Sequence, residues 1–346
     1  MLQGHQSWVF RSQPLITSTS TVVGPFEARS PLAKYFDAIH GDTWVDQDSW
    51  EKAEKKMLEE ATEKAVQKAG LEKEQIQFYI GGDLMSQLIS SNFAARTLAL
   101  PFLGIFGACS TSMEGLALGA LMVDSGNART VMTGTSSHNS AAEKQFRYPT
   151  EYGAQKPDTA QWTVTGAGAA VIQSADDVAP NPAIKITSAT IGRIVDMGIS
   201  DPFNMGAAMA PAAVDTISAH FRDLQCSFAD YDLVVTGDLG RVGYGIAKDL
   251  FAKHNIEIPE ENFKDCGVMI YPEDEPQVLA GGSGAACSAT VTYGHIMKKL
   301  RSGELRKVLI AATGALMSPI SYQQKESIPC ICHAVSLESS GDGVQI

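Results

Sequence analysis

The feature that most constrains the fold of this 346-residue chain is a similarity between its two halves. Residues 231–238 resemble residues 76–83, 155 positions earlier, and both stretches end on Gly-Asp. The turn at 284–288 follows the similar turn at 107–111 by 177 residues, and Gly303, Arg306 and Val308 repeat earlier residues at that same spacing. Agreement at several separate points favours an internal duplication over chance.

Short apolar runs and longer amphipathic runs alternate along each half. Residues 50–69 are the clearest helix, with Asp48 as the expected N-cap and Gly70 after its end. The other expected elements are strands at 15–23, 76–80, 129–134, 165–172 and 231–236, and helices at 113–124 and 214–224. Such alternation predicts parallel sheets covered by helices.

We expect the halves to span residues 1–178 and 183–346, joined near 175–182 and packed as one compact unit. The chain is long enough for one large domain or for two smaller ones.

Composition excludes several classes of function. A net charge of −12 and the lack of a basic stripe disfavour nucleic acid as a partner. No apolar run approaches the ~18 residues of a membrane span, and no secretory signal is recognisable, so a cytosolic protein is expected. Peripheral association with a membrane protein is not excluded by these features. The six cysteines contain no Cys-x-x-Cys pair, which predicts reduced thiols rather than a zinc or disulfide framework.

Cys109 is the leading functional candidate. It lies in Gly-Ala-Cys-Ser-Thr, between an apolar run and the apolar segment 113–124. This order places Cys109 and Ser110 near the N-terminus of a buried helix, where free N–H groups favour a thiolate or an anionic ligand. The alternative is a buried core cysteine, because free cysteine is among the most often buried residues.

Two further polar residues follow expected strand ends. Asp83 closes the strand at 76–80, and His138 follows the strand that ends on Thr133-Gly134. Ligand sites of parallel-sheet folds lie at this edge. The alternatives are that Asp83 caps the next turn or helix, and that His138 only holds a loop by hydrogen bonds.

These features together resemble the thiolase and ketoacyl synthase superfamily over nearly the whole chain. Within it, Phe146-Arg147-Tyr148-Pro149-Thr150-Glu151-Tyr152 and the glycine-rich run 281–287 resemble the stage V sporulation protein AD family. The resemblance implies an α/β protein with five αβαβα layers and two duplicated halves, each with a mixed, mostly parallel sheet.

The family resemblance also implies a function. It implies binding of dipicolinic acid (pyridine-2,6-dicarboxylate), free or as its calcium chelate, during uptake into the developing spore. It further implies integral membrane partners of the same loading system, a position at the cytosolic face of the spore inner membrane, and a homodimer. No cofactor and no resident metal are expected, and calcium would enter only within the chelate.

Enzymes of this superfamily use a cysteine nucleophile with two partners, His and His or His and Asn. Cys109 matches the nucleophile, but the matching loops read Thr236-Gly237-Asp238-Leu239-Gly240 and Gly281-Gly282-Ser283-Gly284. The resemblance therefore predicts a non-catalytic binder in which Cys109 is vestigial. The predicted ligand-binding residues are Asp83, Cys109, Ser110, His138, Gly282 and Ser283. Asp238 is a further candidate, as are Arg147, Arg193 and Arg241, the possible ion partners.

Two alternatives remain open at this point. One is an acyltransferase of the condensing type that uses Cys109 with His138 as its base. The other is an assembly protein for a spore membrane channel, with a vestigial pocket.

Overall fold

The computed structural model describes residues 1–146, 156–178, 183–259 and 261–339. Ten of the fifteen described strands form two groups of five, and both groups have the same relative order. In the first group the order is β6-β5-β7-β9-β3. These strands are β3 (Leu15–Val23), β5 (Phe78–Gly82), β6 (Phe102–Gly104), β7 (Thr130–Ser137) and β9 (Gly166–Gln173).

The second group has the order β12-β11-β14-β15-β10. Its members are β10 (Ile184–Thr190), β11 (Leu233–Thr236), β12 (Phe263–Asp265), β14 (Lys307–Ala315) and β15 (Cys330–Ser339). In each group the three strands farthest from the junction are parallel, and the fourth is antiparallel to both of its neighbours. The groups meet where β3 pairs with β10 at Ile16 and Ile184.

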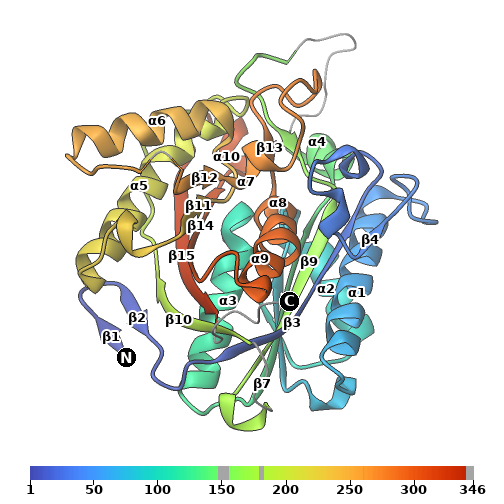
Figure 1. The fold of residues 1–346 in the computed structure, drawn as a ribbon. Helices are drawn as coiled ribbons and strands as arrows, with labels where there is room; N and C mark the ends of the chain where they lie inside the picture. Colours follow the sequence, from blue (N-terminus) through green and yellow to red (C-terminus); the bar gives the residue numbers. More distant parts are fainter. Residues whose placement is uncertain (147–155, 179–182, 260, 340–346) are drawn as a thin grey trace.

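Helices form three layers around these sheets. The outer helices are α1 (Trp50–Lys68) and α2 (Ile89–Leu98) on one side, and α5 (Met205–Leu224) and α6 (Gly240–Lys253) on the other. The middle layer holds α3 (Thr111–Asp124), α8 (Ala285–Thr290), the π-helical η8 (Val291–Ile296) and α9 (Met297–Ser302). Figure 1 shows the middle helices between the two sheets, which is the predicted αβαβα order.

The remaining elements are short and lie at the edges. They are β1 (Leu2–Gln3), β2 (Ser7–Val9), β4 (Ala38–Ile39), β8 (Trp162–Thr163), β13 (Gly282–Ser283), α4 (Asn139–Phe146), α7 (Cys266–Met269) and α10 (Pro319–Gln323). The 3-10 turns are η1 (Glu27–Arg29), η2 (Ala33–Tyr35), η3 (Lys73–Gln75), η4 (Ser86–Leu88), η5 (Ala108–Ser110), η6 (Ala175–Asp177) and η7 (Phe228–Asp230).

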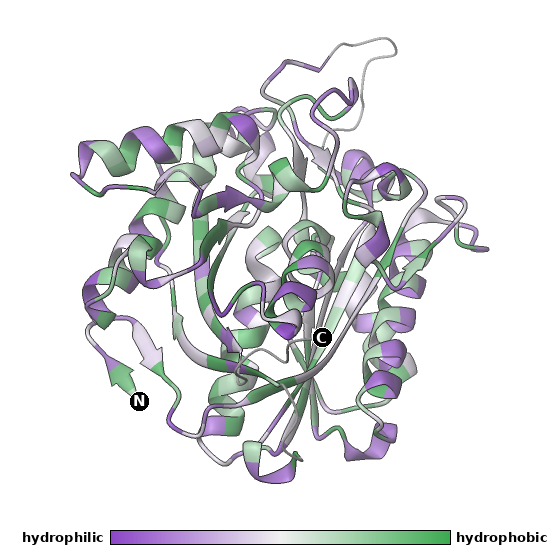
Figure 2. Cartoon of the chain, viewed as in Figure 1, coloured by the Kyte–Doolittle hydropathy of each residue, from purple (hydrophilic) through white to green (hydrophobic). Residues whose placement is uncertain are grey.

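Burial explains why α3 occupies the middle layer. Nine of its fourteen residues are buried, and none of the other five is exposed. A Cβ on Gly115 would lie 2.1 Å from Thr133 Oγ1, so only glycine permits this close approach of α3 to β7. The outer helices instead mix hydrophilic and hydrophobic positions (Figure 2), as expected for helices with one solvent face.

Two helix boundaries differ from the sequence prediction. Ser49, not Asp48, caps α1, because the Ser49 side chain accepts the Lys52 N–H. Helix α5 begins at Met205, well before the predicted start at 214, and continues through Pro211. The small residues of its first turns show no apolar periodicity, which is why the sequence pattern missed them.

Two further predictions concern the division of the chain and the membrane. The predicted halves remain a proposal, since residues 179–182 lie outside the described residues and β2 pairs with β10 of the second group. None of the described helices combines the length and hydrophobicity needed to cross a membrane.

Candidate functional site

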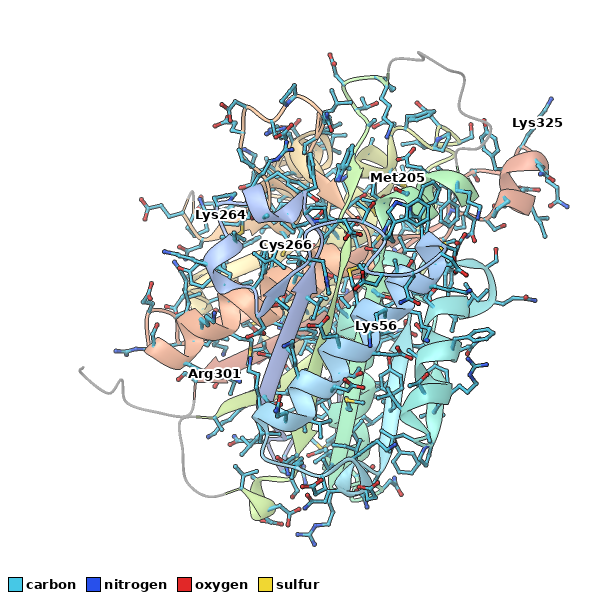
Figure 3. All side chains as sticks on the ribbon, turned by 90° about the vertical axis from the view of Figure 1, so that its right-hand side faces the viewer. Lys56, Met205, Lys264, Cys266, Arg301 and Lys325 are labelled. Atoms are coloured by element: carbon cyan, nitrogen blue, oxygen red, sulfur yellow. The ribbon has the colours of Figure 1, made fainter. Side chains whose placement is uncertain are left out.

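Cys109 lies at a small cavity between the two halves. It belongs to η5, immediately before α3, and is 6% exposed. The centre of a water molecule can occupy about 40 Å³ of this cavity. Most lining residues are apolar: Leu84, Phe106, Ala108, Cys109, Ala142, Phe146, Met205, Ala315 and Met317, together with Thr163, Ser283 and Gly284. Figure 3 shows Met205 on the same side of the molecule as Lys325, just beyond α10.

Two helix N-termini of the middle layer point at this cavity. One is the η5–α3 turn with Cys109, and the other is the start of α8, whose N-cap is Gly284. Gly284 has a φ of +98°, and Ser137 Oγ would lie 2.7 Å from a Cβ there, so glycine is required at this turn. Helix N-termini carry partial positive charge and stabilise anionic groups.

Asp238 already occupies part of this positive region. Its Oδ1 accepts the Thr313 hydroxyl at 2.7 Å, and its Oδ2 accepts the Gly284 N–H at 3.3 Å. The Cys109 thiol lies close enough to interact with this carboxylate. Asp238 is fully buried, and burial raises the pKa of its carboxyl to about 7 despite its two hydrogen bonds.

The surroundings of Cys109 disfavour the thiolate form that a helix N-terminus would favour. Burial is the largest cause that raises the pKa of the Cys109 thiol well above its usual value, and the charge of Asp238 adds to it. The dipole of a helix N-terminus is too weak to offset both effects. These effects favour the thiol form of Cys109 over the thiolate.

Each of the two loops that lack the enzymatic partners contains a glycine with no room for a side chain. A Cβ on Gly282 would lie 2.7 Å from Ile270 Cγ2. A Cβ on Gly237 would lie 2.9 Å from the Ala312 Cα, which is backbone and cannot move aside. A side chain at either glycine would require the surrounding residues to shift.

The remaining predicted residues take different places. Ser283 lines the cavity, and Gly282 precedes it in β13, which pairs with β8. Ser110 is buried away from the cavity lining, and its hydroxyl donates to the Gly107 carbonyl at 2.7 Å. Asp83 accepts the N–H groups of Met85 at 2.8 Å and Ser91 at 2.7 Å, which braces the start of α2.

His138 holds two loops together and is absent from the cavity lining. Its Nε2 bonds the Thr43 carbonyl at 2.8 Å, and its Nδ1 accepts the Ser140 N–H at 3.2 Å. Nε2 therefore carries the proton of the neutral ring. Burial lowers the pKa of His138, so the ring is uncharged at neutral pH.

The predicted arginine partners do not converge on the cavity. Arg193 is exposed and forms a bidentate ion pair with Asp215 of α5. Arg241 donates to the carbonyls of Leu279 and Glu273. Arg147 lies outside the described residues. Among the described residues, no cluster of His, Cys, Asp and Glu has the arrangement of a metal site.

Comparison with known proteins identifies the family. The family model described as Stage V sporulation protein AD matches residues 4–338. The Stage V sporulation protein AD of Bacillus subtilis (strain 168) is 51% identical over 341 residues, which are 98% of each chain. The chain belongs to the Stage V sporulation protein AD family.

Solved structures with the same fold are enzymes of low sequence identity. A single-residue variant of OleA from Xanthomonas campestris matches with a TM-score of 0.62 and 15% identity, covering 97% of this chain and 100% of OleA. The 3-oxoacyl-[acyl-carrier-protein] synthase III of Aquifex aeolicus VF5 matches with a TM-score of 0.56 and 14% identity, covering 94% of this chain and 99% of the synthase. These matches confirm the predicted thiolase-like fold of this family member.

Sequence reasoning missed most of the cavity wall in this family member. It also missed two residues that hold Asp238 in place. The Thr313 hydroxyl donates to the Asp238 carboxylate, and Gln161 Nε2 donates to the Asp238 carbonyl at 2.6 Å. The apolar residues Phe146, Met205 and Met317 carry no pattern that distinguishes a cavity wall from a core.

Proposed function

We propose that this chain is a non-catalytic binding protein for dipicolinic acid or its calcium chelate, acting in its uptake into the developing spore. The observation that carries the non-catalytic part is that the loops at 236–240 and 281–284 contain no histidine and no asparagine. A nucleophilic cysteine needs a base that removes its proton, whereas Asp238 stabilises the protonated thiol.

The shape and charge of the cavity support a flat acidic ligand. Its apolar walls, including Phe106 and Phe146, suit an aromatic ring. The two helix N-termini suit carboxylates, and Ser283 and Thr163 add hydroxyl groups. A calcium chelate would bring less negative charge beside Asp238 than the free dianion does.

Isothermal titration calorimetry of the full chain with dipicolinate, with and without calcium, tests this proposal. We expect saturable one-site binding that weakens in Cys109→Ala and Ser283→Ala, whose side chains line the cavity. Ser110→Ala is the matched control, because Ser110 is equally buried but does not line the cavity. Absence of heat beyond dilution in both conditions would reject the ligand and favour an assembly role.

We infer that the protein works as a homodimer beside integral membrane partners at the spore inner membrane. Support for the dimer comes from β6, the last strand of the first group, whose outer edge pairs with no described strand. Beside this edge lie exposed apolar side chains: Ile89, Phe93, Leu103 and Phe106. A second copy that paired with β6 would cover them. Sedimentation velocity that shows only monomer at micromolar concentration would reject the dimer.

The apolar walls leave one competing function, acyl transfer on Cys109. Its test is mass spectrometry of the intact chain after incubation with acyl-CoA of several chain lengths. We expect no adduct on Cys109, and an adduct that disappears in Cys109→Ala would replace the binding proposal with the enzymatic one.

A further inference from the structure

The loop between β4 and α1, residues 40–49, presents an aromatic side chain at the surface (the Trp44 loop). It projects from the body of the protein beside β4 (Figure 1). Trp44 is 45% exposed, and by volume it is the largest of the exposed apolar side chains among the described residues. Its ring stacks on Trp50 of α1, with centroids 5.3 Å apart and planes 28° apart. Tryptophan is enriched among the residues that contribute most of the binding energy in protein interfaces.

Three aspartates lie within four residues of Trp44 in the sequence. Asp42, Asp46 and Asp48 are all exposed. Asp48 pairs with Lys52 at 2.6 Å, whereas Asp42 and Asp46 form no ion pair within the described parts of the chain. Carboxylates and the face of an indole ring both attract cations. The side chains of Arg and Lys suit both, because each carries a cation on an apolar stem.

The loop holds Trp44 in a fixed position. Asp42 Oδ1 accepts the N–H groups of Trp44 at 2.7 Å and Val45 at 2.9 Å. Val45 is buried in the same core cluster as Met57 of α1. A contact residue that is already ordered loses little conformational entropy when a partner binds.

Helix α4 connects this loop to the cavity beside Cys109. At its start, His138 bonds the carbonyl of Thr43 in the Trp44 loop. Lys144 of α4 pairs with Glu51 of α1 at 2.7 Å. Two further residues of α4, Ala142 and Phe146, line the cavity. A partner on the Trp44 loop would therefore lie one short helix away from the ligand.

We propose that the Trp44 loop docks an arginine- or lysine-bearing segment of a protein partner. The cation lies over the Trp44–Trp50 stack, and Asp42 and Asp46 supply its counter-charge. The same carboxylates repel the anionic headgroups of a membrane surface, which favours a protein over a lipid. Cytosolic loops of integral membrane proteins are rich in Lys and Arg, so the membrane partners proposed above carry the required charge. The docking itself holds whatever the ligand in the cavity is.

Calorimetry of the full chain with a capped Arg-Gly-Arg-Gly-Arg peptide at low ionic strength tests this proposal. We expect saturable binding that added salt weakens, and no binding of the matching Glu-Gly-Glu-Gly-Glu peptide. Trp44→Ala and the double variant Asp42→Asn/Asp46→Asn should each weaken binding about fivefold or more. Asn at position 42 keeps an oxygen that can accept the Trp44 N–H, so the turn is retained.

The matched control is Glu273→Gln/Asp274→Asn, which removes two exposed carboxylates elsewhere on the surface. It should bind the arginine peptide as the unmodified chain does. Trp44→Phe, which keeps an aromatic face, should retain most of the affinity and guards against misfolding of the alanine variant. Absence of saturable binding, or equal affinity in all these variants, would overturn the docking proposal and leave the dicarboxylate proposal untouched.

Discussion

Asp83 and Asp238 occupy equivalent positions in the two halves but do different work. Each follows the central parallel strand of its group, β5 or β11, and each is fully buried. Asp83 accepts two N–H groups, from Met85 and Ser91, within eight residues of itself. Asp238 instead accepts hydrogen bonds from Thr313 and Gly284 and interacts with Cys109, and these residues belong to three separate segments of the chain.

The difference teaches how one half of a duplicated fold acquires a site. In the first half, Asp83 stabilises only local structure. The pKa of the neighbouring Glu54 carboxyl rises well above its usual value, because Glu54 is buried and because Asp83 is charged. In the second half, Asp238 lies across the junction from the first half and interacts with the turn that holds Cys109. The cavity lies where these two halves face each other.

The largest expected effect is on stability, in Asp83→Ala. This change leaves the N–H groups of Met85 and Ser91 buried without acceptors, which should lower the free energy of unfolding by about 2–4 kcal/mol. Urea denaturation measures it. Dipicolinate affinity of the folded fraction should stay unchanged, and a fall in affinity would show that Asp83 also serves the site.

The pH dependence of stability should separate the two aspartates next. The pKa of Asp238 in the folded chain is about 7, raised by burial from 3.8. Between pH 3.8 and pH 7 the Asp238 carboxyl is protonated in the native state but ionised in the unfolded chain. This group therefore makes the free energy of unfolding fall as pH rises, by at most about 1.4 kcal/mol per pH unit. Asp238→Asn should remove this contribution. The measurement is the urea midpoint of the unmodified chain and of Asp238→Asn at pH 5, 6 and 7.5. Midpoints that change equally with pH in the two proteins would contradict the assignment.

The smallest expected effect concerns the reactivity of Cys109. Asp238→Asn removes the charge that adds to burial in raising the pKa of the thiol, so alkylation by iodoacetamide should accelerate. The gain is about tenfold for each unit by which the pKa falls, since the thiolate is the reactive form. Peptide mass spectrometry at pH 8 measures it. Asp83→Asn is the control and should leave the rate as it is.

Much of the fold was predictable because it depends on local patterns repeated at fixed distances. The strands β5 and β11 and the turns before α3 and α8 were predicted from their residues and spacing. The site was less predictable. Cys109 and Ser283 do line the cavity, but Phe146, Met205 and Met317 are ordinary apolar residues until the halves pack together.

The sequence by itself determined the duplication, the buried helix at 113–124 and the absence of an imidazole and an amide from the loops at 236–240 and 281–284, because these follow from residue type and order. Only the tertiary structure decided that Asp238 lies beside the Cys109 thiol, that Asp83 and His138 hold loops, and that Gly237 and Gly282 have no room for a side chain. The physical reason is that hydrogen bonds and burial depend on which distant segments meet, and identical local sequences can meet different neighbours.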